Sequence, residues 1–168
     1  MVLDAIRMLL FPAVMAFAAS SDLLTMTISN RLTLALAAGF AVLAAASGMA
    51  LADVGLHLAA GGIVLTIGFG CFAMGWIGGG DAKLAAATAL WLGFEHLMTY
   101  LLYASLFGGV LTVLLIQFRA LPLPAMMARQ PWIMRLHEKG AGVPYGIALA
   151  AAALMIYPQT GWMSHLAG

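Results

Sequence analysis

The chain has 168 residues, of which 64% are apolar and only 8% are charged, against roughly a quarter of charged residues in an ordinary soluble domain. So few charges cannot cover the surface of a soluble domain of this size, and that class is excluded. The seven basic residues form no stripe with interleaved aromatic residues, which argues against a nucleic-acid-binding protein. The single cysteine, Cys71, lies in an apolar run, so a disulfide framework and a cysteine-based metal site are excluded too.

Apolar segments follow one another along the chain and predict one all-α domain over residues 1–168, a polytopic membrane bundle of about six transmembrane helices. The segments cover residues 3–20, 31–50, 55–77, 82–93, 96–118 and 143–160. The first begins with Asp4 and Arg7 rather than with a basic stretch. We therefore expect it to be a retained helix rather than a cleaved signal peptide.

The fourth segment is short. At about 1.5 Å per residue, about a dozen residues cannot cross a hydrocarbon core of about 30 Å. The glycines of residues 78–80 precede this segment. Irregular backbone at membrane depth is tolerated where it lines a protein cavity or a wet cleft. The sequence therefore predicts a site at residues 78–84.

The basic residues predict the orientation of the bundle. If the loop after the first helix is cytoplasmic, Arg7 lies outside and the other basic residues lie inside, which agrees with the positive-inside rule. Both termini are then expected on the external side, and Asp22 and Asp81 at the cytoplasmic membrane edge. The residues expected inside are Arg31, Lys83, Arg119, Arg129, Arg135 and Lys139. The acidic residues expected outside are Asp4, Asp53 and Glu95.

Two secondary features complete the pattern. The loop over residues 120–142 interleaves apolar and basic residues; it fits either an amphipathic segment on the inner leaflet or a basic loop that only retains the orientation. The tryptophans lie near the ends of apolar segments, where an aromatic belt at the membrane interface is expected. They are Trp76, Trp91, Trp132 and Trp162.

Asp22 and Asp81 are the candidate chemical groups. A carboxylate near hydrocarbon is costly and is retained where it has a partner or a task. Two adjacent carboxyl groups can hold one proton between them, so that one accepts a proton from water while the other protonates a peptide carbonyl. This is the chemistry of aspartic proteases, which requires neither a metal nor a cofactor.

Each aspartate also has a structural interpretation. Asp81 directly precedes an apolar helix and could be its N-cap. Asp22 could end the first helix and form an interfacial ion pair with Arg31. The shared side of the membrane, the short fourth segment and the glycine turn favour a joint functional site over these two separate roles.

Three motifs resemble those of the type IV prepilin peptidases, which are GxGD-type aspartyl proteases. Residues 78–84 (GGGDAKL) look like the family's GxGDxKL signature. Asp22 followed by residues 28–32 (ISNRL) is similar to the family's D-x(5)-I-P-N-x-L stretch, with Ser29 where proline is usual. Residues 142–148 (GVPYGIA) look like the V-P-Y-G-x-A segment of the short branch that serves Flp/Tad pili. The three motifs stand in the family's order and cover nearly the whole chain.

The resemblance implies that Asp22 and Asp81 form the catalytic pair, that Gly78 and Gly80 shape the turn, and that Lys83 contacts a phospholipid phosphate or a substrate carboxylate. It implies an endopeptidase of the bacterial inner membrane that removes the leader of prepilins at the cytoplasmic face. The expected partners are the prepilin helix and leader, membrane lipid and the pilus assembly machinery, without nucleic acid. The chain lacks the paired Cys-x-x-Cys motifs of long members that also methylate the new N-terminus.

Other functions remain as alternatives. A presenilin-like protease would cut within a substrate's transmembrane span, but a Tyr-Asp motif in a separate helix is missing. A small transporter or an assembly scaffold would use Asp22 and Asp81 to bind a proton or a cation. The histidines do not share metal-ligand spacing. We expect His57, His96 and His165 at external ends and His137 in the inner loop.

Overall fold

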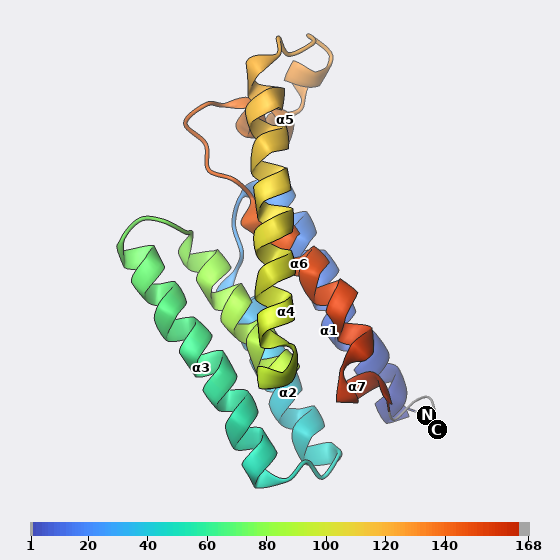
Figure 1. The fold of residues 1–168 in the computed structure, drawn as a ribbon. Coiled ribbons are helices and arrows are strands. Elements are labelled where there is room, and N and C mark those ends of the chain that lie inside the picture. Colours follow the sequence, from blue (N-terminus) through green and yellow to red (C-terminus); the bar gives the residue numbers. More distant parts are fainter. Residues whose placement is uncertain (1, 165–168) are drawn as a thin grey trace.

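The computed structural model describes residues 2–164, and the regular elements in this part of the chain are all helical, which confirms the expected all-α class (Figure 1). The elements are α1 (Val2–Thr25), α2 (Asn30–Ala46), α3 (Leu51–Ala73), α4 (Gly79–Ala120), the 3-10 helix η1 (Met127–Arg129), α5 (Pro131–His137), α6 (Tyr145–Ile156), the 3-10 helix η2 (Tyr157–Gln159) and α7 (Gly161–Ser164).

Helix α4 is broken at Gly93, whose φ of 63° and ψ of −176° are not helical. A side chain is disfavoured at this positive φ, and a Cβ there would lie 3.0 Å from the ring of His57. The break separates a short part, residues 79–92, from a long part, residues 94–120, and the chain turns back between them (Figure 1). The short fourth segment expected from the sequence is therefore a separate arm of α4.

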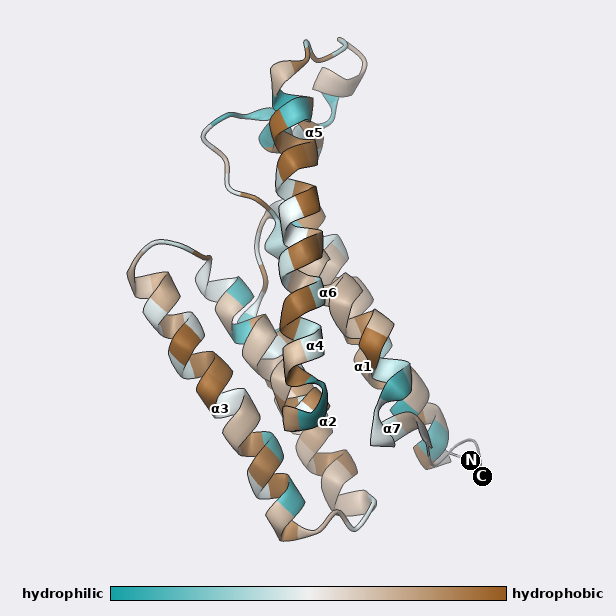
Figure 2. Cartoon of the chain, in the orientation of Figure 1, coloured by the Kyte–Doolittle hydropathy of each residue, from teal (hydrophilic) through white to brown (hydrophobic). Residues whose placement is uncertain are grey.

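Within residues 2–164, three helices are long and apolar enough to cross a membrane, namely α1 from Leu3, α3, and α4. Helices α2 and α6, with 17 and 12 residues, are shorter than the roughly 20 residues that a span needs. The expectation of a membrane helix bundle is thus supported, whereas the count of about six spans is not confirmed. Hydrophobic residues dominate the flanks of α3 and α4, and hydrophilic ones gather around α5 (Figure 2).

Glycines bring α3 close to the short part of α4. A Cβ on Gly61 would lie 3.2 Å from Leu90, and one on Gly68 would lie 3.1 Å from Ala82. Small residues at such positions let membrane helices pack closely. The outer face of α3 is apolar and open, with Ile67 and Phe69 more than 60% exposed. Lipid around this face accounts for the exposure.

An aromatic cluster fills the bundle at the end away from α5. Its centre is Trp91, which is fully buried and donates its indole N–H to the carbonyl of Leu36 at 2.9 Å. Trp162, 5% exposed, donates to the carbonyl of Trp91 at 2.8 Å. The expected place in an aromatic belt is therefore wrong for these two tryptophans, because backbone carbonyls inside the bundle satisfy their N–H groups. The rings around Trp91 belong to Phe11, Phe40, Tyr157 and Trp162.

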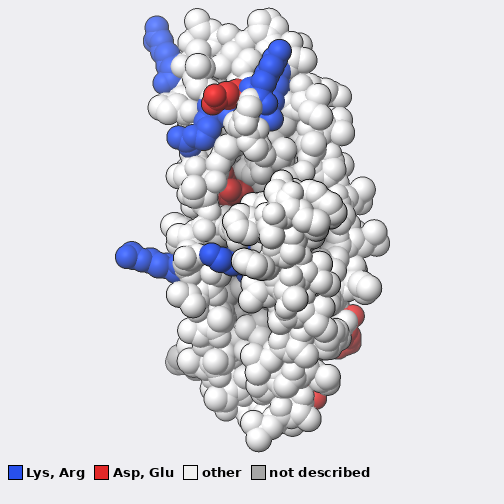
Figure 3. All heavy atoms as spheres, turned by 90° about the vertical axis from the view of Figure 1, so that its left-hand side faces the viewer, with Lys and Arg blue, Asp and Glu red and all other residues white. Residues whose placement is uncertain are grey.

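The loop between α4 and α6 folds back onto the bundle through its arginines. Arg135 donates to the carbonyl of Leu24, near the end of α1, at 2.7 Å. Arg119 donates to the carbonyls of Leu136 at 2.7 Å and Gly142 at 2.8 Å. Figure 3 shows the Lys and Arg side chains on the upper and middle parts of one face, with acidic atoms both among them and near its lower end. Part of the basic loop thus closes the same end of the bundle to which α1 brings Asp22.

Candidate active site

Asp22 lies in the last turn of α1, which continues to Thr25 and is longer than the sequence suggested. The helix ends where Met26 takes a positive φ of 53° while its N–H still donates to the carbonyl of Asp22 at 2.8 Å. The hydroxyl of Ser21 fixes the following turn by donating to the carbonyl of Thr27 at 3.0 Å. Asp22 is only 4% exposed, so its carboxyl group faces the protein interior.

Asp81 is the third residue of α4 and not its N-cap. The N-cap is Gly78, which has no capping side chain. The Asp81 carboxyl group instead folds back against Gly78 and interacts with its backbone N–H, the contact that an acidic residue at this position makes in a capping box. The glycine turn therefore does two things: it begins the helix, and it holds one oxygen of a half-buried carboxyl group.

The carboxyl group of Asp22 lies against the start of α6, and Asp81 lies within electrostatic range of it. The backbone N–H of Gly146 donates to Oδ2 of Asp22 at 2.7 Å, and Asp22 and Asp81 are close enough to interact electrostatically. Ile28, in the turn after α1, packs against both Gly80 and Gly146. Residues far apart in the sequence, from α1, α4 and α6, thus form one site.

Close approach explains why glycine occupies two of these positions. A Cβ on Gly146 would lie 2.7 Å from Oδ2 of Asp22 and 2.8 Å from Cδ1 of Ile28. A Cβ on Gly80 would lie 3.2 Å from Cβ of Ile28. Sequence reasoning assigned no role to Gly146, although the residues 142–148 that contain it had been singled out as a motif.

A sequence profile of the type IV leader peptidase family matches residues 9–113, more than half of the chain. The chain belongs to the type IV leader peptidase family. The matched region includes both Asp22 and Asp81, whereas Gly146 lies beyond it. Neither a curated protein nor a solved structure matches the chain. Family membership makes this protein a peptidase, and its apolar helices agree with a membrane peptidase.

Lys83 of this leader peptidase does not join the aspartates. It lies two positions after Asp81, and side chains with that spacing do not share a helix face. Its Nζ donates to Oδ1 of Asn30, the first residue of α2, at 2.9 Å. Lys83 also borders an apolar groove of about 570 Å³ between α2, α3 and the short part of α4.

The remaining candidate partners of the aspartates lie elsewhere. Arg31 is exposed, and the described part of the chain shows no ion pair between it and Asp22. His57 and His137 contact the backbone carbonyls of Leu90 and Leu121, each at 2.8 Å. His165 lies outside the described residues. Within residues 2–164, no cluster of three or more His, Cys, Asp or Glu side chains could hold a metal ion.

Proposed function

We propose that this chain is an aspartic endopeptidase that removes the leader of Flp/Tad-type prepilins at the cytoplasmic face of the bacterial inner membrane. The observation that carries the proposal is that a buried carboxyl group on α1, which the first turn of α6 holds, and a half-buried carboxyl group on α4 lie within electrostatic range of each other. Membership of the type IV leader peptidase family supports the reaction class. The substrate branch rests on the resemblance of residues 142–148 to the Flp/Tad segment.

In the proposed mechanism, Asp22 and Asp81 share one proton and hydrolyse a peptide bond. The ionised carboxyl group takes a proton from water, whose oxygen attacks the scissile carbonyl carbon, while the protonated carboxyl group donates to the carbonyl oxygen. The carbon–nitrogen bond then breaks, and the departing amine receives a proton from the pair. Each aspartate has one oxygen against a backbone N–H, of Gly146 or of Gly78, which leaves its other oxygen for this exchange.

The substrate would approach from the lipid. A prepilin contains an apolar helix directly after its leader, and this helix would pack laterally against the bundle. The groove bordered by Lys83 supports such packing because its lining is mostly apolar and includes small residues such as Ala37, Gly61 and Ala86. Because glycine has no side chain, Gly78 and Gly80 would let the substrate backbone come close to the carboxyl groups.

Neutralising either aspartate tests the proposal. Asp22→Asn and Asp81→Asn each remove a proton donor or acceptor, and we expect leader removal to fall by about 100-fold or more. The measurement is cleavage of a full-length prepilin in proteoliposomes, followed by mass and by the position of the cut. Glu138→Gln, at an exposed residue of the α4–α6 loop, is the matched control and should cleave normally.

The outcomes separate the alternatives. Cleavage at the wild-type rate in either Asn variant contradicts a catalytic pair. A cut within the transmembrane span of the substrate would indicate a presenilin-like protease instead. Proton or cation flux that depends on both carboxyl groups, without any proteolysis, would indicate a transporter.

The proposed contact of Lys83 with a phospholipid phosphate or a substrate carboxylate has its own test. Lys83→Met removes the cation but keeps the length of the side chain, and we expect KM for the prepilin to rise by about fivefold, or 1 kcal/mol, with kcat retained. Asn30→Ala removes only the hydrogen bond between α2 and α4. An equal KM increase in both variants would mean that Lys83 merely joins the two helices.

A further inference from the structure

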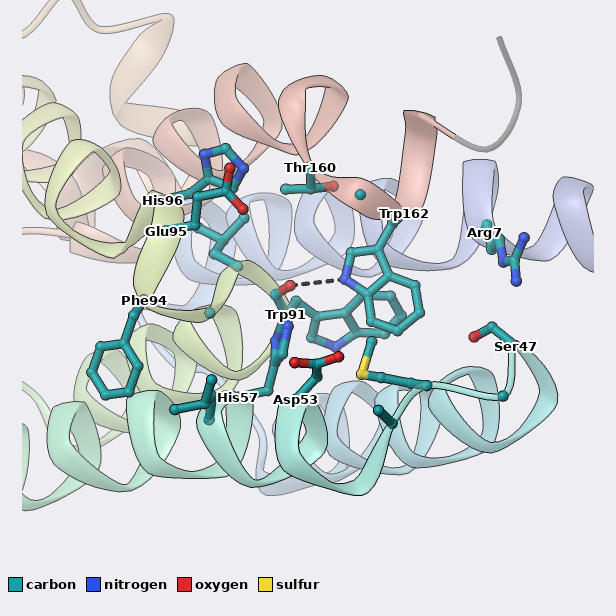
Figure 4. Close-up of a pocket in the computed structure, with 17 residues that line it drawn as sticks. Arg7, Ser47, Asp53, His57, Trp91, Phe94, Glu95, His96, Thr160 and Trp162 are labelled. Atoms are coloured by element: carbon teal, nitrogen blue, oxygen red, sulfur yellow. Dashed lines mark hydrogen bonds between the residues drawn. The ribbon is translucent and has the colours of Figure 1, made fainter. Parts of the chain in front are cut away.

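A second cavity, of about 560 Å³, lies at the end of the bundle opposite the aspartate pair. It is bounded by α1, the α2–α3 turn, α3, the Gly93 break in α4, and the segment after η2 (Figure 4). Neither Asp22 nor Asp81 lines it. The proposed protease chemistry therefore leaves this cavity without a role.

Arg7 supplies a buried positive charge at one side of the cavity. Only 8% of its surface is exposed, and its Nε has no hydrogen-bond partner among the described residues. Its Nη1 forms an ion pair with Oδ1 of the partly exposed Asp4 at 3.6 Å, a distance too long for a hydrogen bond. In Figure 4 the side chain extends from α1 toward the turn that carries Ser47. A buried guanidinium with an unused donor is costly, and an anionic ligand would remove that cost.

Acidic groups lie at other positions around the same cavity. Asp53, on the first turn of α3, and Glu95, just after the Gly93 break, both line it and are exposed. His57 is engaged with the carbonyl of Leu90 through Nδ1. The lining therefore combines one buried cation with two accessible carboxylates. A ligand that carries both an anionic and a cationic group matches this charge pattern better than a simple anion does.

Part of the rim of the cavity is apolar and exposed. Leu56 on α3 and Phe94 on α4 line it and are 56% and 45% exposed. Met98, one turn further along α4, is 76% exposed. A ligand held here would have its polar group in the cavity and apolar chains along these two helices, as an interfacial lipid does.

We propose that this cavity binds a zwitterionic phospholipid whose phosphate contacts Arg7 and whose primary ammonium group contacts Asp53 and Glu95. A guanidinium hydrogen-bonds well to phosphate oxygens, and a primary ammonium offers three donors to carboxylates. A quaternary ammonium offers none, so the site should distinguish an ethanolamine head group from a choline one. An external location follows from the topology proposed above.

Lipid binding to the full-length protein in detergent micelles tests the proposal, with phosphatidylethanolamine, phosphatidylcholine and phosphatidylglycerol of identical acyl chains as probes. Native mass spectrometry measures the fraction of lipid-bound protein. We expect the wild type to bind phosphatidylethanolamine about tenfold more tightly than phosphatidylcholine. The double variant Asp53→Asn/Glu95→Gln should bind the two within about twofold, and Arg7→Gln should weaken all three. Glu138→Gln, at the opposite end, should keep the wild-type preference.

Several results would overturn the proposal. One is equal binding of the ethanolamine and choline lipids by the wild type, and another is an unchanged preference in the double variant. The double variant tests the proposal even if Arg7→Gln fails to fold, because Asp53 and Glu95 are both exposed and their substitution should not disturb folding. If glycerophosphoethanolamine, which has the head group without acyl chains, binds as tightly as the lipid, the occupant is a soluble molecule and the lipid assignment is wrong.

Discussion

The two ends of the bundle carry buried charges whose sign is opposite to that of the exposed groups nearby. Beside the arginine-rich loop lie Asp22, which is buried, and Asp81, which is half-buried. At the far end Arg7 is buried in a cavity that also exposes Asp53 and Glu95. The exposed charges agree with the positive-inside pattern, whereas the buried ones depart from it. The buried charges, whose sign differs from that of their exposed neighbours, therefore mark the sites where we expect chemistry or binding.

The ends also differ in how they are held together. At the aspartate end, glycines let three backbones approach one another around two carboxyl groups. At the far end, a packed set of aromatic rings surrounds Trp91. We therefore expect substitutions at the first end to change activity more than stability, and those at the second to change stability more than activity.

Outside the aspartate pair, the largest effect is expected for Gly146→Ala. Its Cβ would overlap Oδ2 of Asp22 and Cδ1 of Ile28, so the carboxyl group of Asp22 must be displaced. A displacement of about 1 Å in an active site can cost about 100-fold in rate, and we expect prepilin cleavage to fall by that factor with little change in thermal stability. Gly142→Ala, where a Cβ meets nothing within 4 Å, is the control. A fully active Gly146→Ala variant would contradict the expectation that substitutions at the aspartate end change activity.

A smaller effect, on stability, is expected for Gly93→Ala. The substitution combines a positive φ with a Cβ only 3.0 Å from the ring of His57, and such strain costs about 1–3 kcal/mol. Thermal unfolding in detergent should show a lowered midpoint. Gly109→Ala, in the long part of α4 with no atom within 4 Å of the new Cβ, should not lower it. Equal midpoints for the two variants would mean that the break at residue 93 tolerates a side chain.

Trp162→Phe should have the smallest effect. It removes the hydrogen bond to the carbonyl of Trp91 but keeps an aromatic ring, and the expected loss is about 1 kcal/mol of unfolding free energy. Cleavage by the folded variant should be unchanged. Trp76→Phe, at a tryptophan that is 69% exposed, should change neither property. A loss of activity without a loss of stability in Trp162→Phe would show that the two ends are coupled.

The sequence was sufficient for the class of the fold, because hydropathy is a local signal. From the GxGD-like turn, which is also a local signal, the sequence predicts Asp81 together with Asp22 as the catalytic pair, which stays a prediction. It predicted the separate short arm of α4 from length alone, and the structure confirms a break at Gly93. Its estimate of where α1 ends was too short, because the polar residues after position 20 resemble a loop although Ser20 and Thr25 hydrogen-bond within the helix.

Contacts between residues far apart in the chain could not be predicted from the sequence. The donation from Gly146 to Asp22 joins residues 124 positions apart, and neither composition nor periodicity reports such a pair. Trp91 and Trp162 were misplaced for the same reason, since an indole at the end of an apolar segment fits a membrane interface as well as a core. The burial of Arg7 likewise depends on the packing of several helices.

The glycine contacts of α3 have a consequence for the setting in which the peptidase works. Gly61 and Gly68 place α3 directly against the arm of α4 that carries Asp81 in its first turn, while the opposite face of α3 is open to acyl chains. A helix adjusts its tilt when its apolar length and the bilayer thickness differ. Because α3 and this arm pack closely at the two glycines, a change in the tilt of α3 would also move the arm. Turnover is therefore expected to vary with lipid chain length, so that the surrounding bilayer acts as part of the enzyme.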